Sequence, residues 1–402
     1  MKKDRKEKGN VPNLRFPGFE GEWKKMKLGD VGDVKMCRRI FNDETTPIGE
    51  IPFYKIGSFG KDADAFISKE LYLDYRKRFS FPEKGDILIS AAGTIGRTVV
   101  YKGDDAYFQD SNIVWIDNDN TTIRNEFLYY ILQIVKYNTE GGTIQRLYNN
   151  ILKSTRFSAP SISEQKRISN FLSLIDQRIE TQNKIIEELK RLKTALVDRL
   201  YNPTIKRNSH LRFPEFQEEW DKTTLENITE NFNRRNKEKI GYPMYSVTNN
   251  QGFVPQSEKF GDREMVGEDI YSYKIIKSGE FAYNPARINV GSIARYNEDF
   301  PCMVSSLYVC FKLKGNIDSN WTLHLLKSRR INFYYDVYGE GGVRIYLFYP
   351  NFSRIKVSVP KLNEQIKIGK FISKINERVD TEIDLDYKYK CQKSALLKHL
   401  FI

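Results

Sequence analysis

The chain has 402 residues, 40% of them hydrophobic, and a formal net charge of +13. This length allows two or three domains, and the apolar content is sufficient for folded cores. No run approaches 18 consecutive apolar residues, and the charged stretch from Met1 to Lys8 lacks the apolar segment of a signal peptide. The sequence therefore argues against a membrane span and predicts a cytoplasmic protein.

Basic charge and frequent aromatic residues indicate the class of partner. The chain carries 65 Lys and Arg against 52 Asp and Glu, together with 24 Tyr and 25 Phe. This composition favours a polyanion, and nucleic acid first. A membrane surface is less favoured, because no basic amphipathic helix stands apart from the predicted domains.

A ten-residue segment near the N-terminus occurs again in the second half of the chain. LRFPGFEGEW at 14–23 and LRFPEFQEEW at 211–220 agree at seven of ten positions, 197 positions apart. This separation is too long for a solenoid repeat and indicates a duplicated domain. The whole chain is then a globular half followed by a long helix, twice.

The first globular half, residues 14–159, combines several strand-type runs with one helix-type run. The runs Ile51–Ile56, Gly85–Ser90, Thr98–Tyr101 and Ile113–Ile116 predict short strands. Residues 126–137, EFLYYILQIVKY, have the length and spacing of a helix. The mixture predicts an α+β domain.

Residues 160–200 predict a long helix that needs a helical partner. Two interleaved heptad series run through it, and eight of their ten positions are apolar. Ser161 and Glu164 fit a capping box at its start. A helix from Ser163 to Leu200 is ~57 Å long at about 1.5 Å per residue. The two series are Ile168, Ile175, Gln182, Leu189 and Leu196, and Leu172, Ile179, Ile186, Lys193 and Leu200.

The predicted partner helix lies in the same chain, 200 positions later. The stretch that begins at Pro360 matches the stretch that begins at Pro160, including a Glu-Gln pair four residues further on. Asn363 is its predicted N-cap, while Glu382 and Asp386 weaken its apolar seam. We expect the two helices to pack on each other as a rigid rod.

The second globular half, residues 211–359, follows the same order of elements with different residues. Met244–Thr248 predicts a strand that ends in a polar turn, and Gly279–Pro285 corresponds to the strand from Gly85. Scaffold glycines repeat, whereas the loop residues differ. Two copies of one fold with different loops suit a protein that recognises two different short targets.

Catalytic motifs are missing from the sequence. There is no GxxxxGK[ST] phosphate loop and no Asn/Asp-Pro-Pro-aromatic tetrapeptide to hold a flipped adenine; the nearest strings, at 202–205 and 284–287, lack the second proline and the aromatic residue. Three histidines and four cysteines are scattered without metal-ligand spacing, and the cysteines are expected to be free buried thiols. We therefore expect no catalytic residue, metal or cofactor, and a self-sufficient enzyme is disfavoured.

The chain resembles the specificity subunits of type I restriction–modification enzymes. The resemblance covers nearly the whole chain. It is carried by the two LRFPxFxxEW openings, GDILISAAGTIGR at 85–97, YPMYSVTNNQGFVPQSEKF at 242–260, YNPARINVGSIARY at 283–296 and both P-x-x-x-E-Q helices. It implies two α+β target-recognition domains, each reading one half of a split DNA site. It also implies two antiparallel coiled-coil spacer helices that set the gap between the half-sites.

The implied organisation is a basic arm at 1–13, target-recognition domains at 14–159 and 202–359, and spacer helices at 160–201 and 360–402. A member of this family would bind double-stranded DNA and recruit two modification (methyltransferase) subunits and two restriction (motor-nuclease) subunits, without catalysis of its own. Since the two halves differ in sequence, the half-sites should differ too. The alternative is an orphan or decoy copy that acts mainly as a protein-interaction module.

Loop residues of the right chemical types are the predicted DNA contacts. Phosphates require Lys and Arg, and base edges require Arg, Asn, Gln, Ser and Thr. A surface Arg or a turn Asn is also commonly only solvated, and that alternative stands for every position. In the first half the predicted contacts are Arg38, Arg39, Ser58, Thr94, Arg97, Gln109, Ser111, Asn112, Gln145 and Arg146; in the second half they are Arg234, Arg235, Asn249, Asn250, Gln251, Asn284, Arg287, Asn289 and Arg344.

Overall fold

The chain divides into two compact units. A computed structural model describes residues 9–137, 146–201, 211–238, 240–256, 270–342 and 345–402. The first unit comprises residues 1–182 and 385–402, and the second unit comprises residues 183–384. Among the described residues, no helix combines the length and the apolar character that crossing a membrane requires.

Both predicted long helices are present, each with 39 residues. They are α4 (Ile162–Leu200) and α10 (Leu362–Leu400). The N-terminal cap of α4 is Ser161, whose Oγ accepts the N–H of Glu164 at 3.5 Å. The predicted cap of α10 was wrong: Asn363 lies inside the first helical turn, because the helix begins one residue earlier.

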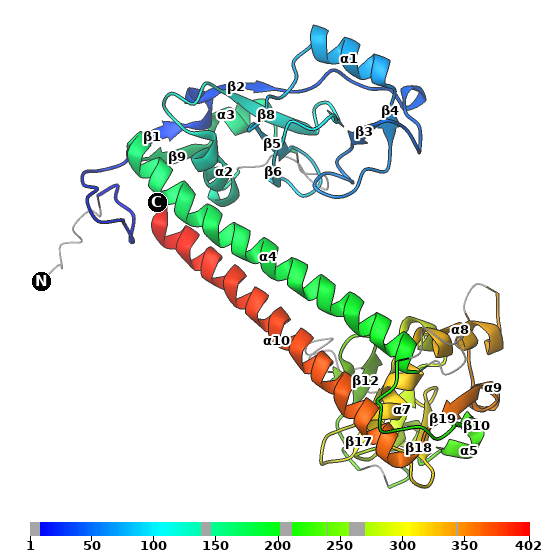
Figure 1. Cartoon of the computed structure of the whole chain (residues 1–402). Helices are drawn as coiled ribbons and strands as arrows, with labels where there is room; N and C mark the ends of the chain where they lie inside the picture. Colours follow the sequence, from blue (N-terminus) through cyan, green and yellow to red (C-terminus); the bar gives the residue numbers. More distant parts are fainter. Residues whose placement is uncertain (1–8, 138–145, 202–210, 239, 257–269, 343–344) are drawn as a thin grey trace, which may run out of the picture. The chain divides into compact units, whose positions relative to one another are not determined.

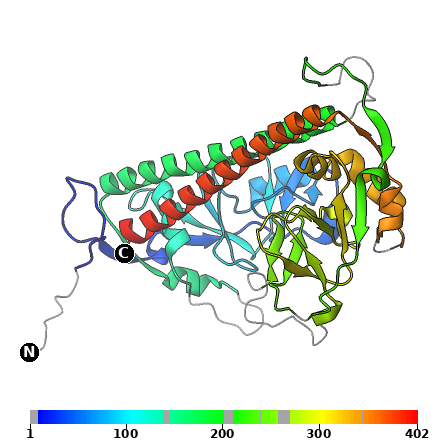
Figure 2. The ribbon, with the colours of Figure 1, turned by 90° about the horizontal axis from the view of Figure 1, so that it is seen from below.

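In the first unit, the beginning of α4 and the end of α10 lie side by side and run antiparallel (Figures 1 and 2). Ile168 and Leu172 are buried in one core with Leu400. Nearer the middle of both helices, Lys393 Nζ lies 2.7 Å from Asp176 Oδ1. The second unit pairs the other two halves in the same way, with Ile368 and Ile372 of α10 beside Leu200 of α4. The predicted antiparallel helix pair is thus confirmed within each unit.

The two acidic residues that weaken the second seam are buried and neutralised along their own helix. Glu382 pairs with Arg378, and Asp386 Oδ2 lies 2.6 Å from Lys390 Nζ. Each partner is four residues away, which places it on the same helix face.

The globular part of the first unit is α+β. A four-stranded antiparallel sheet has the order β2-β8-β5-β6, and a second sheet has the order β4-β3-β7 (Figure 1). β1 pairs with β9, which leads directly into α4. The elements are β1 (Lys24–Lys27), β2 (Gly32–Lys35), β3 (Ile51–Tyr54), β4 (Phe66–Ile67), α1 (Lys69–Arg78), β5 (Ile87–Ser90), β6 (Thr98–Val100), β7 (Tyr107–Phe108), β8 (Ile113–Asn118), α2 (Asn125–Ile134), α3 (Asn149–Ser154) and β9 (Arg156–Ala159), with 3-10 turns η1 (Leu28–Asp30) and η2 (Asn42–Glu44).

The second unit repeats this fold. Its main sheet has the order β11-β18-β15-β16, which matches β2-β8-β5-β6 strand for strand, and β10 pairs with β19 as β1 pairs with β9. The predicted duplication is therefore confirmed. The elements are β10 (Asp221–Thr224), α5 (Leu225–Ile228), β11 (Thr229–Phe232), β12 (Tyr245–Thr248), β13 (Gly252–Pro255), η3 (Ile270–Ser272), β14 (Lys274–Ile276), β15 (Phe281–Tyr283), η4 (Ile288–Val290), β16 (Ile293–Arg295), β17 (Cys302–Val304), β18 (Val309–Leu313), α7 (Ser319–Leu326), α8 (Arg329–Tyr338), α9 (Tyr349–Ser353) and β19 (Lys356–Val359).

The cysteines only partly follow the expectation of free buried thiols. All four are free, and Cys37, Cys302 and Cys310 are buried in the globular cores. Cys391 is exposed on α10, so the expectation of burial was wrong there.

The repeated sequence motifs of each half are contact partners. Arg15 of the first LRFP motif donates from Nε and Nη2 to Glu164 at the start of α4, at 2.8 and 2.7 Å. Arg212 of the second motif makes the same two-pronged contact with Glu364, at 2.8 Å for both bonds. The two carboxylates are 1% and 2% exposed. We call each contact a clasp. The clasp also explains why Glu164 does not complete the predicted capping box, since both its oxygens accept from Arg15.

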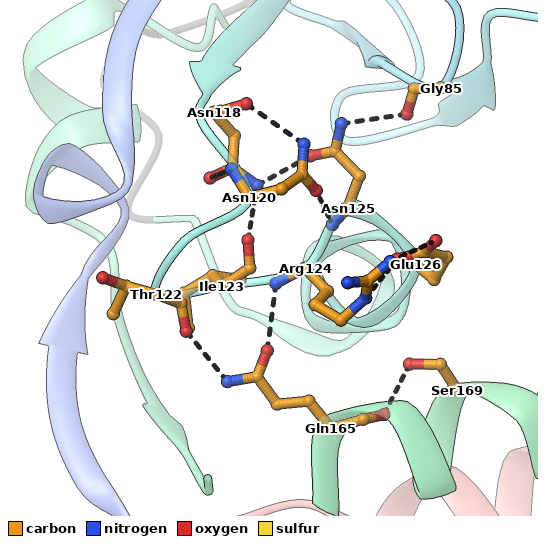
Figure 3. Close-up of polar contacts among 10 residues, drawn as sticks. All are labelled: Gly85, Asn118, Asn120, Thr122, Ile123, Arg124, Asn125, Glu126, Gln165 and Ser169. Carbon is orange, nitrogen blue, oxygen red and sulfur yellow. Dashed lines mark hydrogen bonds and ion pairs between the residues drawn. The ribbon is translucent and has the colours of Figure 1, made fainter. Parts of the chain in front are cut away.

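The neighbouring glutamine, Gln165, joins α4 to the loop before α2. Gln165 Oε1 accepts the N–H of Arg124, and Nε2 donates to the carbonyls of Thr122 and Pro160, each at 3.0 Å. Figure 3 shows this amide reaching from α4 to the loop before α2, beside a cluster of asparagines. In the second unit, Gln365 Oε1 accepts the N–H of Asp318 at 2.8 Å, so this joint is also used twice.

Breaking one clasp should destabilise its unit strongly. Arg15→Ala leaves the buried carboxylate of Glu164 without its cation, which we expect to cost roughly 2–4 kcal/mol. Urea unfolding of the full chain, with hydrogen exchange to locate the first unit, measures this loss. Arg78→Ala is the matched control in the same unit, because Arg78 and Asp74 form an exposed pair that should contribute under about 1 kcal/mol. Equal effects of the two substitutions would contradict the clasp.

His324 in α7 occupies an environment that opposes its protonation. Its Nε2 lies 3.2 Å from Ser373 Oγ of α10. Burial first, and then the positive charges of Lys193, Lys327 and Arg295, lower the pKa of His324 to about 4. The ordinary pKa is near 6.5, so below that pH the unfolded chain binds a proton that the folded unit refuses.

The second unit should therefore lose stability between pH 6.5 and pH 4 and keep this contribution above pH 6.5. We expect its free energy of unfolding to fall by about 1–2 kcal/mol from pH 7 to pH 5 on account of His324. Urea unfolding at both pH values measures the change. His324→Gln should reduce the pH dependence, whereas His399→Gln, which alters an exposed histidine, should leave it intact. An unaltered pH dependence in His324→Gln refutes the assignment.

Candidate nucleic-acid interface

In the first unit, loops that are distant in sequence meet beyond the end of β5. The N–H of Ile56, in the loop after β3, donates to Gln109 Oε1 of the β7–β8 turn at 2.9 Å. Arg97 Nη1, from the β5–β6 turn, donates to the carbonyl of Phe59 at 2.8 Å. These bonds gather three predicted contact loops into one surface.

Left-handed backbone conformations shape the turns of this surface. Gly93 and Gly96 have φ of +62° and +79°, which lets the β5–β6 turn close tightly and leaves Thr94 exposed. Ser111 also has a positive φ, +51°, although it carries a side chain. Such a conformation is uncommon outside glycine and stores strain.

Two predicted arginines of the first unit are exposed at the edge of the same loops. The guanidinium of Arg38 lies 5.3 Å from the ring centroid of Phe79. Arg39 is 60% exposed and pairs with Asp110 at 2.9 Å. Both side chains are exposed to solvent.

Other predicted contacts are partly or fully buried and have hydrogen-bond partners within the loops. Ser58 is 5% exposed, and its Oγ accepts the N–H of Lys55 at 3.1 Å. Gln109 is half-buried and engaged with Ile56, as described above. Arg146 is half-buried and donates to Ser111 and Asn112. Gln145 lies outside the described residues.

In the second unit, a polar turn and the loop after β15 form the corresponding surface. Asn249, Asn250 and Gln251 are exposed between β12 and β13. Gly291, with φ of +95°, packs against Asn249, and Ser292 Oγ donates to the carbonyl of Val247 at 2.6 Å. The turn that carries these three polar side chains is thus held in place by Gly291 and Ser292.

The loop after β15 contains three more predicted contacts. Arg287 is exposed. Asn284 Oδ1 accepts the N–H of Ala286 at 3.0 Å, and Asn289 Nδ2 donates to Asp336 Oδ1 at 3.1 Å. Arg344 lies outside the described residues.

Arg234 and Arg235 are neighbours in sequence with different environments. Arg234 makes a two-pronged ion pair with Glu280, with both bonds at 2.9 Å, and this hydrogen bonding raises the pKa of the guanidinium. Arg235 is exposed. The geometry gives Arg234 a structural partner and leaves Arg235 facing solvent.

The sequence analysis did not predict the exposed apolar side chains of the second unit. Leu307, just before β18, is 75% exposed, and Tyr346 and Phe348 stack at 6.2 Å while 39% and 48% exposed. In sequence, IYLFYP at 345–350 is indistinguishable from a buried strand. Exposed apolar side chains can also contact bases, because aromatic rings stack on bases and aliphatic groups contact the thymine methyl group.

Each unit has an equivalent backbone contact, beside which the two units carry different side chains. The N–H of Leu147 donates to the carbonyl of Ala91 at 2.9 Å, and that of Leu347 donates to the carbonyl of Pro285 at 3.1 Å. Each contact lies at the end of the matching central strand, β5 or β15. The fold is thus duplicated, while the side chains that follow the matching strands differ between the two units.

Comparisons with known proteins identify the family. A model of the type I restriction modification DNA specificity domain matches residues 20–191 and again residues 217–385. The chain therefore belongs to the family of type I restriction–modification specificity subunits, whose members are the non-catalytic components of these systems.

Individual relatives agree with this family. A Haemophilus influenzae protein named as a type I restriction enzyme specificity subunit is 54% identical over 167 residues, which are 41% of this chain and 43% of that protein. The MjaX specificity subunit of Methanocaldococcus jannaschii is 25% identical over 74% of this chain and 72% of its own length. Among the solved structures, the type I S subunit of M. genitalium has a TM-score of 0.59 at 19% identity, covering 98% of this chain and 99% of that chain.

Replacing Arg234 by alanine should lower stability, whereas replacing Arg287 by alanine should weaken DNA binding. Arg234→Ala leaves Glu280 unpaired and should lower the stability of the second unit by about 1–2 kcal/mol. Arg287→Ala removes an exposed charge and should weaken DNA binding about tenfold with little change in stability. Thermal unfolding and fluorescence anisotropy with target DNA separate the two effects. A stable Arg234→Ala protein with weakened DNA binding would reverse these roles.

Proposed function

We propose that the chain is the DNA-recognition subunit of a type I restriction–modification complex and that it reads an asymmetric, split site, one half with each unit. The observation that carries this proposal is the shared anchor at Ala91 and Pro285. One backbone geometry presents Arg146 in the first unit and Tyr346 in the second, so a common scaffold holds unlike readers.

Charge supports the choice of ligand. The net charge of +13 favours a polyanion, and exposed Arg38, Arg39, Arg235 and Arg287 border the two loop surfaces. Binding that neutralises phosphates releases counterions and weakens steeply with salt. The predicted contacts named above remain the candidates for these bonds, in the first unit through Thr94, Arg97, Ser111 and Asn112 as well.

The long helices are proposed to set the gap between the half-sites. A helix of 39 residues is about 58 Å long. Half-sites for paired readers lie about one duplex turn, roughly 34–36 Å, or a multiple apart. Helices of this length are on that scale.

The proposed partners are two modification subunits and two restriction subunits, with methylation and cleavage performed by those subunits. The proposed domain limits are those expected from the sequence, with target-recognition domains at 14–159 and 202–359. The proposed location is the cytoplasm, where the chromosomal DNA would be available to the complex.

Mapping of methylated adenines tests the proposal. The full chain is expressed with its modification subunits in a methylation-free host, and the genome is read by long-read sequencing. We expect one motif with two unlike halves and a constant gap, and no methylation from the chain alone. Exchanging residues 14–159 for the domain of another family member should change one half and leave the gap unchanged.

The outcomes distinguish the alternatives. A variable gap, or a change in both halves of the motif, contradicts the proposal. A chain that binds modification subunits yet fails to shift DNA with them in a gel is an interaction module, the decoy alternative.

A further inference from the structure

In the first unit, Arg146 is held by two side chains of the β7–β8 turn. Its Nη2 donates to Asn112 Oδ1 at 3.0 Å and to Ser111 Oγ at 3.4 Å. The side chain is half-buried, and no carboxylate in the described part of the chain forms an ion pair with it. A guanidinium held in this way has no anionic partner, and its remaining N–H groups can donate to water or to a ligand.

Backbone contacts fix the arginine and its acceptors to the same strand end. The N–H of Ala91 donates to the carbonyl of Asn112 at 2.7 Å, and the carbonyl of Ala91 accepts the N–H of Leu147, the residue after Arg146. The hydroxyl of Ser111 is presented from a left-handed backbone, φ +51°. Glycine would relieve that strain but would lose the acceptor for Arg146.

The N–H groups that remain indicate what the guanidinium can bind. With Nη2 engaged, Nη1 keeps two N–H groups to donate, and arginine has no acceptor. Nε and Nη1 share no open edge, because Cδ lies between them, so the contact is left to Nη1. In the major groove guanine presents two acceptors, N7 and O6, thymine presents one beside its methyl group, and adenine and cytosine each present a donor. A held donor nitrogen that can donate to both N7 and O6 therefore fits guanine best. An exposed arginine such as Arg38 is better suited to a phosphate.

The second unit lacks this arrangement at the matching positions. The shared anchor places Tyr346 where the first unit has Arg146. The sheet register, Tyr283 opposite Val309 as Ile89 is opposite Val114, places Leu307 where the first unit has Asn112. The second unit therefore provides an internal control.

We propose that Arg146 recognises a guanine in the half-site bound by the first unit, and that Ser111 and Asn112 are positioning residues that hold its guanidinium. This inference rests on the proposed function and adds the base that one reader selects.

The test uses the full chain with its modification subunits and the methylated-adenine motif as readout. In Arg146→Ala, one guanine of the first half-site should relax to any base, with discrimination at that position falling roughly 10- to 100-fold. The second half-site and the gap should not change. Arg146→Gln should move the preference from guanine towards adenine, because the glutamine amide pairs with N6 and N7 of adenine.

Substitutions of the turn test positioning. Ser111→Gly and Ser111→Ala should both weaken discrimination at the same guanine, while Ser111→Gly keeps or raises the thermal unfolding temperature. A merely structural serine would leave the base preference unchanged. Tyr346→Ala is the matched control and should affect only the second half-site. If Arg146→Ala fails to fold, Arg146→Gln and Ser111→Gly carry the same test.

The two proposals fail in different ways. A wild-type complex that directs no split motif overturns the proposed function and this inference with it. A wild-type split motif that the Arg146 and Ser111 variants leave unchanged overturns this inference alone. Uniformly weaker methylation with an unaltered motif also overturns it, because that is the signature of a phosphate contact.

Discussion

The buried Arg–Glu clasp is the contact on which each unit depends. It joins an entry segment to a helix start about 150 residues later, Arg15 to Glu164 and Arg212 to Glu364. A carboxylate that is almost fully buried is tolerated only with its cation in place, so a unit with an open clasp carries an uncompensated charge. The clasp therefore ties the start of the long helix to the segment that enters the globular part. The repeated motifs of the sequence are the two sides of this contact.

Contacts that do not depend on side chains explain how the readers can differ. The loops are anchored through backbone groups, Leu147 to Ala91 and Leu347 to Pro285. A backbone N–H donates equally well whatever side chain its neighbour carries. The position beside this anchor can consequently hold an arginine in one unit and a tyrosine in the other without rebuilding the sheet. Recognition is free to change while the scaffold stays the same.

The sequence predicted those features that are local or periodic. The strands from Gly85 and Gly279 and both long helices are visible as runs and heptads, and the structure has them within a few residues. The contacts of the site residues were harder to predict from the sequence, because their partners are distant in the chain. Glu280 lies 46 positions from Arg234, so a neutralised arginine and a free one give the same sequence signal. Burial of Ser58 depends likewise on a fold that no local pattern reveals.

The first unit is not contiguous in sequence, and this links the two units during folding. Its core includes Leu400 and Phe401, with Phe401 stacked on Phe127 at 5.3 Å, and the N–H of Leu14 donates to the carbonyl of His399 at 2.8 Å. The second unit, residues 183–384, lies wholly between these parts. Synthesis of the chain supplies the end of α10 last, so the core of the first unit can be completed only after every residue of the second unit exists. A chain interrupted anywhere in the second unit therefore lacks the apolar residues that finish the first.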